Sequence, residues 1–348
     1  MGQSPDSDSY NDNEDGIPFF QGNADFGEKY PTTRKWCNAP TKIAHAEDIL
    51  ISVRAPIGAL NYAKEECCIG RGLAAITPNQ DKVSSGFIYW LLKGKHKELN
   101  LQGTGSTFKA ISRKVLEEIK VPDIELKKQT ELAGSLEKVY SVIQLRKQQL
   151  EELDILIKAR FVEMFGDPVS NPFNYDKVRL SQIADIKIGP FGSLLHKEDY
   201  IENGHPLVNP SHIVDSKISV DNKLTISNEK YEELGAYKLQ IGDVVMGRRG
   251  EMGRCAVVLE DGLLCGTGSI FIRPTQNVTA DFIQKIISFP SFKKTIEDMA
   301  VGQTMPNLNV PIVSNFEIIH PPVEVQKSYY DFVTQVDKLK FVETIAKF

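Results

Sequence analysis

The sequence contains one pattern twice, with the two copies about two hundred residues apart. Residues 48–58 (DILISVRAPIG) correspond to residues 243–253 (DVVMGRRGEMG); the first aspartate, an arginine and the last glycine match at one constant offset. Three shorter patterns follow in the same order: CIGRG at 68–72 and LCGTG at 264–268, AAITP at 74–78 and IFIRP at 270–274, EIKVP at 118–122 and EIIHP at 317–321. Solenoid repeats have periods of 20–50 residues, so this longer period predicts two copies of a whole domain.

Each copy reads as a similar succession of elements. Short β-type runs are broken by glycine and proline turns, which predicts a sheet or half-barrel. These runs are 48–53 and 73–78 in the first copy, and 243–247, 255–260 and 269–274 in the second. A helical stretch follows in each copy, at 87–99 and at 280–299. A glycine-containing loop comes next, at 103–106 or 302–304, and then an apolar strand that ends at Pro122 or Pro321.

A long helix is predicted after the first of these strands. Residues 126–165 contain no proline and a single glycine, Gly134. Apolar residues recur there in alternating steps of four and three, with Arg146 and Arg160 in the two remaining positions. They are Leu132, Leu136, Val139, Ile143, Leu150, Leu153, Ile157 and Met164. The helix is expected to stop at Gly166, two residues before a proline. The alternative is a helix buried within one domain.

A second, shorter helix is expected to start at Glu324. Its apolar face carries Tyr329, Phe332, Val336 and Leu339. The predicted fold class is therefore α+β, with two similar β-rich domains joined by long, antiparallel coiled-coil helices in a pseudo-two-fold arrangement. The predicted segments are a first domain at 1–123, a long helix at 124–166, a second domain at 167–322 and a C-terminal helix at 323–348. Such a body would hold two recognition surfaces a fixed distance apart.

Composition restricts where the protein works. The five cysteines have no CxxC spacing and are odd in number, which favours reduced thiols in a cytoplasm over a disulfide framework or a zinc site. No apolar run reaches 18 residues, and the acidic, polar start is no secretory signal, so no membrane partner is expected. The net charge of −5 counts against a protein that coats nucleic acid through bulk charge, but basic residues can still gather on one face.

Motifs for catalysis are missing. Asp123, Glu125 and Lys127 imitate a nuclease motif, but a single residue separates the two acids, so a polar helix start is the better interpretation. The stretches at 171–173 and 209–211 each contain one proline and do not match a DNA methyltransferase loop. No GxSxG, HExxH or Walker A motif occurs. The prediction is a binding protein with no catalytic residue and no metal site.

The residues resemble a known family. Residues 159–168 (ARFVEMFGDP), which close the heptad helix, are similar to the central conserved region of specificity (S) subunits of Type I restriction-modification enzymes. Residues 16–22 (GIPFFQG), 48–54 and 68–75 resemble their target recognition domains. The resemblance covers nearly the whole chain.

The resemblance implies a mechanism and a set of partners. Each target recognition domain would read one half of a bipartite site in double-stranded DNA. The helices would set the spacer and dock two modification (methyltransferase) subunits. This chain would bind no cofactor; S-adenosylmethionine, ATP and Mg²⁺ are expected in the modification subunits and in the restriction/translocase subunits. Relative to the family the chain is expected to be shortened at both ends, through an internal start, a split gene or a trimmed clone. A partial S protein that pairs with another half stays open; a self-contained restriction enzyme is disfavoured by the missing motifs.

Candidate DNA-contacting residues lie in polar turns and at the matched arginines. Arginine reads guanine and also clamps phosphate. For Arg54 and Arg249 the alternative is an ion pair with Asp48 or Asp243, and for the polar turns an ordinary surface loop. The candidates are Gln3, Ser4, Ser7, Tyr10, Arg34, Lys35, Arg54 and Arg71 in the first copy, and Gly189, Phe191, Ser193, His196, Lys197, Arg248, Arg249 and Arg254 in the second. The loops at 103–106 and 302–304 are expected on the same face.

Candidate residues for subunit docking lie on the predicted helices. They are apolar positions of the heptad pattern, and a polar partner surface would accommodate the arginines among them. The candidates are Leu136, Val139, Ile143, Leu150, Leu153, Ile157, Val336 and Leu339.

Overall fold

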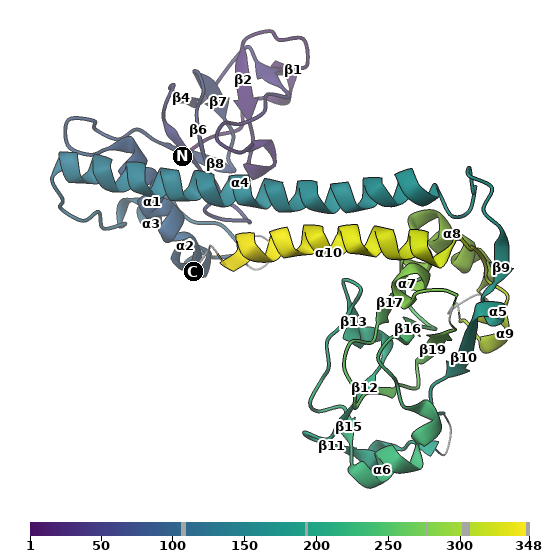
Figure 1. Cartoon of the computed structure of the whole chain (residues 1–348). Coiled ribbons are helices and arrows are strands. Elements are labelled where there is room, and N and C mark those ends of the chain that lie inside the picture. Colours follow the sequence, from purple (N-terminus) through teal and green to yellow (C-terminus); the bar gives the residue numbers. More distant parts are fainter. Residues whose placement is uncertain (106–108, 192–193, 276, 301–306, 346–348) are drawn as a thin grey trace. The chain divides into compact units, whose positions relative to one another are not determined.

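The computed structural model describes residues 1–105, 109–191, 194–275, 277–300 and 307–345. The chain divides into two compact units, Met1–Lys147 and Gln148–Phe348, each with one copy of the repeat. The division falls inside α4 (Leu126–Phe165), so the long helix contributes its first half to unit 1 and its second half to unit 2. The helix predicted from the heptad pattern is confirmed (Figure 1).

Unit 1 contains two small sheets and three short helices before α4. One sheet has the order β1-β3-β2-β7-β4, and the other has the order β6-β5-β8. The strands are β1 (Tyr10–Asn11), β2 (Ile17–Phe20), β3 (Trp36–Cys37), β4 (Ile43–Ala44), β5 (Ile49–Ser52), β6 (Leu60–Tyr62), β7 (Cys67–Ile69) and β8 (Leu73–Ile76). The helices are α1 (Ser85–Gly94), α2 (His96–Leu101) and α3 (Arg113–Glu117).

Unit 2 repeats this plan with additional elements. Its larger sheets have the orders β10-β19-β16-β17 and β11-β15-β12-β18. Their strands are β10 (Ala184–Ile188), β11 (Tyr200–Ile201), β12 (His205–Val208), β15 (Thr225–Ile226), β16 (Val244–Gly247), β17 (Cys255–Val257), β18 (Leu264–Cys265) and β19 (Ser269–Pro274). Two strand pairs complete it, β13 (Ile213–Val214) with β14 (Lys217–Ile218), and β9 (Lys177–Arg179) with β20 (Glu317–Ile319). The helices are α5 (Leu180–Ile183), α6 (Asn228–Glu233), α7 (Ala280–Ser288), α8 (Pro290–Met299), α9 (Val310–Ser314) and α10 (Val323–Ile345).

The two units share their central topology. The order β6-β5-β8 corresponds to β17-β16-β19, and the parallel pair β2–β7 corresponds to the parallel pair β12–β18. Even a helix start is repeated. A glutamine in the helix that follows each domain accepts a hydrogen bond from the backbone N–H of the residue that caps a helix N-terminus. Gln129 of α4 accepts from Ser84, which caps α1, and Gln326 of α10 accepts from Thr279, which caps α7. The predicted duplication of a whole α+β domain is confirmed.

The central strand of each unit is buried on both faces. In β5, Ile49 and Ile51 pack in the core that includes α1, whereas Leu50 packs in the core under the other sheet. In β16, Val244 and Val245 divide between two cores in the same way. Double burial explains why Ile49, Leu50 and Ile51, and likewise Val244, Val245 and Met246, are apolar without a break and do not alternate with polar residues.

The predicted apolar strand before each long helix forms in unit 2 only. There Glu317–Ile319 is β20, which pairs with β9. Residues 118–122 of unit 1 form no strand, so this prediction was wrong, because no described strand of unit 1 occupies the place that β9 has in unit 2. The helical stretches at 87–99 and 280–299 are each two helices, and Pro290 starts the second one in unit 2.

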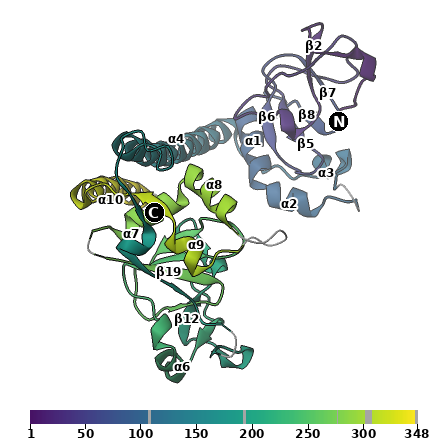
Figure 2. The ribbon, with the colours of Figure 1, turned by 90° about the vertical axis from the view of Figure 1, so that its right-hand side faces the viewer.

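In unit 2, α10 runs antiparallel to the second half of α4 (Figure 1). The Tyr329 hydroxyl donates a hydrogen bond to the carbonyl oxygen of Ile157 (3.3 Å), and the Lys340 ammonium contacts Asp154 (2.6 Å). The rings of Phe161 and Tyr329 meet edge to face with their centroids 5.4 Å apart. Helix α7 lies between this helix pair and β19 (Figures 1 and 2). The antiparallel course predicted for the two helices is confirmed here.

The described helices include none with the length and apolar character needed to span a membrane. All five cysteines lie in described residues and are buried as free thiols. Burial raises the pKa of Cys67 and of Cys255 to about 12, so both thiols stay protonated and unreactive at neutral pH.

A buried ion pair ties β19 to the start of β16. Arg273 donates to both carboxylate oxygens of the fully buried Asp243 (2.8 and 2.7 Å). We expect Arg273→Met to lower the free energy of unfolding by about 3 kcal/mol, because the carboxylate is left buried without its partner. The matched control Lys294→Met, on the exposed surface of α8, should change it by less than about 0.5 kcal/mol. Urea unfolding followed by circular dichroism measures both; equal effects would contradict the prediction.

Candidate nucleic-acid interface

A close crossing of two backbone segments recurs in both units. The Gly2 N–H donates to the carbonyl oxygen of Leu73 (2.8 Å), and the Gly189 N–H donates to that of Ser269 (3.0 Å). A Cβ on Gly2 or Gly189 would overlap with the carbonyl oxygen of Gly70 or of Gly266, respectively. Only glycine therefore fits at this crossing, which we call the glycine seam.

In unit 1 the glycine seam brings three predicted residues together. The Gln3 N–H donates to the carbonyl oxygen of Ile69 (3.0 Å), which holds the N-terminal segment beside the turn at 70–72. The Ser4 hydroxyl accepts a hydrogen bond from the Arg71 N–H (3.4 Å). The side chains of Gln3 and Arg71 are exposed. The polar side chain of Gln3 and the cationic side chain of Arg71 thus lie on the surface in neighbouring backbone segments.

The matched arginines occupy equivalent positions. The N–H of Val53 donates to the carbonyl oxygen of Gly72 (2.9 Å), and the N–H of Arg248 donates to that of Gly268 (3.0 Å). Arg54 then forms an antiparallel bridge with Ala110, and Arg249 forms one with Asn307. Each arginine therefore lies two residues beyond the end of the central strand and borders the glycine seam.

The alternative of an ion pair with the preceding aspartate is not realised. Asp243 pairs with Arg273, and the Asp48 carboxylate accepts a hydrogen bond from the backbone N–H of His45 (2.9 Å). Within the described part of the chain, Arg54 and Arg249 have no carboxylate at salt-bridge distance. Both guanidinium groups are left to face solvent or a ligand.

Unit 2 has a hollow of about 490 Å³ at this place, lined by Ile188, Phe191, Arg248, Arg249, Thr267 and Gly268. The Phe191 ring is 61% exposed. Arg248 is held by Asn307, whose side-chain oxygen accepts from its Nε (3.1 Å). Burial and the neighbouring Arg249 lower the pKa of Arg248, as expected for two cations in a confined space. The hollow can therefore bind an acceptor-rich or anionic group beside an apolar ring.

Several predicted residues lie elsewhere or are engaged within the chain. Tyr10 stacks on Phe19 with the ring centroids 4.6 Å apart and donates its hydroxyl to the carbonyl oxygen of Pro5 (2.6 Å), so its DNA-contacting role is not supported. Arg254 is paired with Glu251 (2.8 Å) and lines a different hollow. Its role as a free base reader is likewise not supported.

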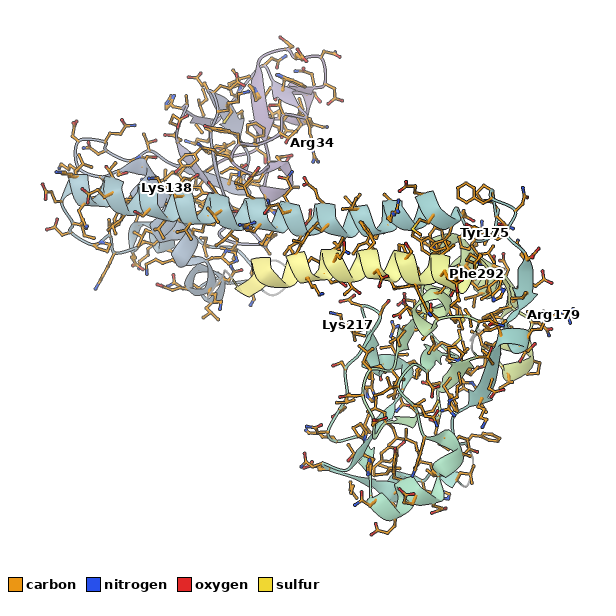
Figure 3. The ribbon with its side chains drawn as sticks, in the orientation of Figure 1. Arg34, Lys138, Tyr175, Arg179, Lys217 and Phe292 are labelled. Atoms are coloured by element: carbon orange, nitrogen blue, oxygen red, sulfur yellow. The ribbon has the colours of Figure 1, made fainter. Side chains whose placement is uncertain are left out.

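The remaining candidates in the described part of the chain are exposed, and no hydrogen bond or ion pair there joins them to the glycine seam. Ser7 belongs to a short 3₁₀ helix, and His196 and Lys197 stand at the start of another. Arg34 and Lys35 precede β3, and Figure 3 shows Arg34 on the outside of unit 1. Ser193 and the loop at 302–304 lie outside the described residues.

Three residues at the site escaped the sequence analysis. Asn307 holds Arg248, and Lys109 accepts the backbone N–H of Ala55 through its carbonyl oxygen (3.0 Å), which braces the arginine loop of unit 1. The third, Thr267, stands between Gly266 and Gly268 as Arg71 stands between Gly70 and Gly72. The repeat carried the signal for Thr267, whereas no pattern indicated Asn307.

The docking candidates divide by exposure. Leu136, Val139, Ile143 and Leu339 are exposed by 39–59%. Leu150, Leu153 and Ile157 are half-buried, and Ile157 packs against the core of unit 2. Val336 is only 4% exposed, so it packs within the chain and is not presented for a partner. Figure 3 shows Lys138 on the same helix as the exposed group.

The glycine seam makes a prediction about stability. Gly189→Ala should lower the free energy of unfolding by about 1–3 kcal/mol, because its Cβ meets the backbone at Gly266, which cannot yield as a side chain can. The control Gly235→Ala has no atom within 4 Å of its Cβ and should be nearly neutral. The midpoints of urea unfolding measure the difference. An unchanged midpoint for both variants would contradict the prediction, because it would show that the two backbone segments can move apart to accommodate the Cβ without loss of stability.

Known proteins are similar to this chain in sequence and in fold. The chain is 43% identical over 154 residues to the MjaX type I restriction enzyme specificity subunit of Methanocaldococcus jannaschii, which covers 44% of this chain and 36% of that protein. It is 21% identical over 272 residues to the MjaVIII specificity subunit of the same organism, covering 73% of this chain and 63% of the relative. The chain thus spans less than two thirds of the length of either relative.

A solved structure shares the fold over nearly the whole chain. It is the crystal structure of a Type-I restriction-modification system S subunit from M. genitalium, with a TM-score of 0.55 at 16% identity, covering 99% of this chain and 88% of that one. The family model of the Type I restriction modification DNA specificity domain matches residues 1–154 and 172–347. One match falls on each copy of the repeat, and the chain belongs to the family of Type I restriction modification DNA specificity domains.

Proposed function

We propose that the chain is a DNA-specificity subunit in which each domain reads one half of a bipartite double-stranded site. The observation that carries this proposal is the duplicated arginine, Arg54 and Arg249, which lies at equivalent places beside the glycine seam and has no carboxylate at salt-bridge distance among the described residues. A guanidinium presents two parallel donors, which match the O6 and N7 acceptors of guanine in the major groove. A buried strand that ends two residues before the arginine limits its position, and a fixed position is what base selection needs.

The two half-sites are expected to differ. The scaffold is duplicated, but the side chains on it are not, because Arg71 in unit 1 is replaced by Thr267 in unit 2. Unit 2 adds the exposed Phe191 ring, which suits apolar contact with a thymine methyl group. Unit 1 presents the guanidinium donors of Arg54 and Arg71, whereas unit 2 presents the Phe191 ring beside Arg249. The two domains are therefore expected to select different bases.

The chemistry belongs to partners in this proposal. Exposed apolar residues of α4, at Leu136, Val139 and Ile143, suit docking of modification subunits. Those two subunits supply S-adenosylmethionine and the methyl-transferring residues, and restriction/translocase subunits supply ATP- and Mg²⁺-dependent steps. The assembly works in the cytoplasm, where the buried free thiols remain reduced.

Mapping of methylated bases tests the reading function. The chain co-expressed with its modification subunits should direct methylation to a site with two unlike half-sites at fixed spacing. Arg249→Gln should weaken the base preference in one half-site by about 10- to 100-fold, because a bidentate contact contributes about 1–3 kcal/mol of discrimination, and should leave the other unchanged. The control Lys223→Gln, an exposed lysine of unit 2, should change neither half-site. Methylation by the isolated chain, or loss of preference in both half-sites, would overturn the proposal.

The helix should act as a ruler. Inserting four helix-forming residues between Lys147 and Gln148 lengthens α4 by about 6 Å and turns it by about 40°. One base pair advances the duplex by about 3.4 Å and turns it by about 34–36°. The spacer should therefore grow by about one or two base pairs while both half-sites stay the same. A length-neutral replacement of four residues at that point serves as the control, and an unchanged spacer after insertion would refute the ruler.

A further inference from the structure

Unit 2 carries a second cationic region that no sequence motif indicated. Two hollows, of about 470 and 950 Å³, lie beside α4, α7 and the β13–β14 hairpin. Both are lined by Lys158, Lys285, Asp215 and Ser216, so they form one continuous groove. Lys217, labelled in Figure 3 on the hairpin, lines the larger hollow. We call Lys158, Lys217 and Lys285 the basic groove.

Most other cations at the groove are already neutralised. Lys340 pairs with Asp154 (2.6 Å) and Asp337 (3.1 Å). Lys293 and Arg254 share Glu251, at 3.1 and 2.8 Å. In the portion of the chain that the structure describes, no carboxylate lies at salt-bridge distance from the three lysines of the basic groove. Asp215, on the hairpin, is the one further acid in the lining.

Lys285 lies close to other positive charges in the basic groove. Its ammonium lies 5.9 Å from the centre of the Phe161 ring and is half-buried. Burial, Lys158 and Lys340 lower the pKa of Lys285, and Asp154 opposes them in part. A bound anion would relieve this crowding, because its negative charge would lie close to Lys158 and Lys285.

The basic groove and the hollow at Arg248 and Arg249 have a common neighbour, Pro210. Its carbonyl oxygen accepts a hydrogen bond from Arg254 (3.2 Å), which lines the groove, and its ring lies against Gly268, which lines the arginine hollow. Cationic side chains therefore line two regions of unit 2, and Pro210 lies beside a lining residue of each.

We propose that the basic groove binds phosphates of the DNA that flank the bases read at Arg248 and Arg249. The proposal rests on the proposed function and adds a site to it. Lysine is a point charge without a planar donor fork, so it suits phosphates better than base edges. Phosphate contacts fix the register of a protein on the duplex and carry no sequence information, so the two regions divide positioning and reading between them. An acidic segment of a partner protein is the competing occupant.

Salt-dependent binding of the full chain tests this site. The probe is a fluorescent 25-base-pair duplex of scrambled sequence, titrated at several salt concentrations. Each phosphate contact contributes about 0.9 to the slope of log affinity against log salt. The double variant Lys158→Gln/Lys285→Gln should lose about 10-fold in affinity at low salt and reduce the slope by about two. Lys294→Gln/Lys223→Gln removes the same charge from exposed positions outside the groove lining and should leave the slope unchanged.

The outcomes separate the two proposals. A reduced slope, with methylated half-sites unchanged in the double variant and circular dichroism that confirms folding, supports the groove. An unchanged slope overturns the groove and leaves the reading function standing. Unchanged DNA affinity with loss of co-purifying modification subunits assigns the groove to a protein partner and also overturns the proposal. Failure of the unaltered chain to bind any duplex at low salt would refute both.

Discussion

The structure depends on one strand in each unit that is buried on both faces. Strands β5 and β16 separate two cores, so they cannot slide or twist without exposing apolar side chains on one side or the other. The matched arginine lies two residues beyond the end of this strand in both units. Burial of the strand on both faces thereby limits where the backbone of Arg54 or Arg249 can lie. The same short segment therefore contributes buried core residues at its start and a candidate DNA-reading arginine at its end.

The glycine seam allows one backbone scaffold to present different side chains in the two units. The close crossing of backbone segments involves main-chain atoms, so it does not depend on the side chains beside it. Arg71 can be replaced by Thr267 at the middle of the turn without disturbing the flanking glycines. The side chains that face a ligand are thus free to change while the backbone that presents them is held constant.

The second half of α4 has two roles in unit 2. Its aromatic side contributes Phe161 and Phe165 to the core with Phe282 and Tyr329, which anchors α7 and α10 to the helix. The adjacent Lys158 faces the basic groove with Lys285 of α7. The same helix that links the two repeats therefore also supplies part of a cationic surface. In the proposed function, this places the positioning of DNA on the element that sets the spacing.

The sequence by itself determined the duplication, the long helix and the correspondence of Arg54 and Arg249 in the two copies of the repeat. These are readable because a constant offset and a heptad period are properties of residue order alone. Residue order does not show which side chains find partners inside the chain: Tyr10 stacks on Phe19, Arg254 pairs with Glu251, and Val336 is buried. Nor could it show that residues 118–122 form no strand, because strand pairing depends on a neighbour distant in sequence. Tertiary structure alone decided that Lys158, Lys217 and Lys285 share a groove, because only folding brings a helix, a hairpin and a second helix to one place.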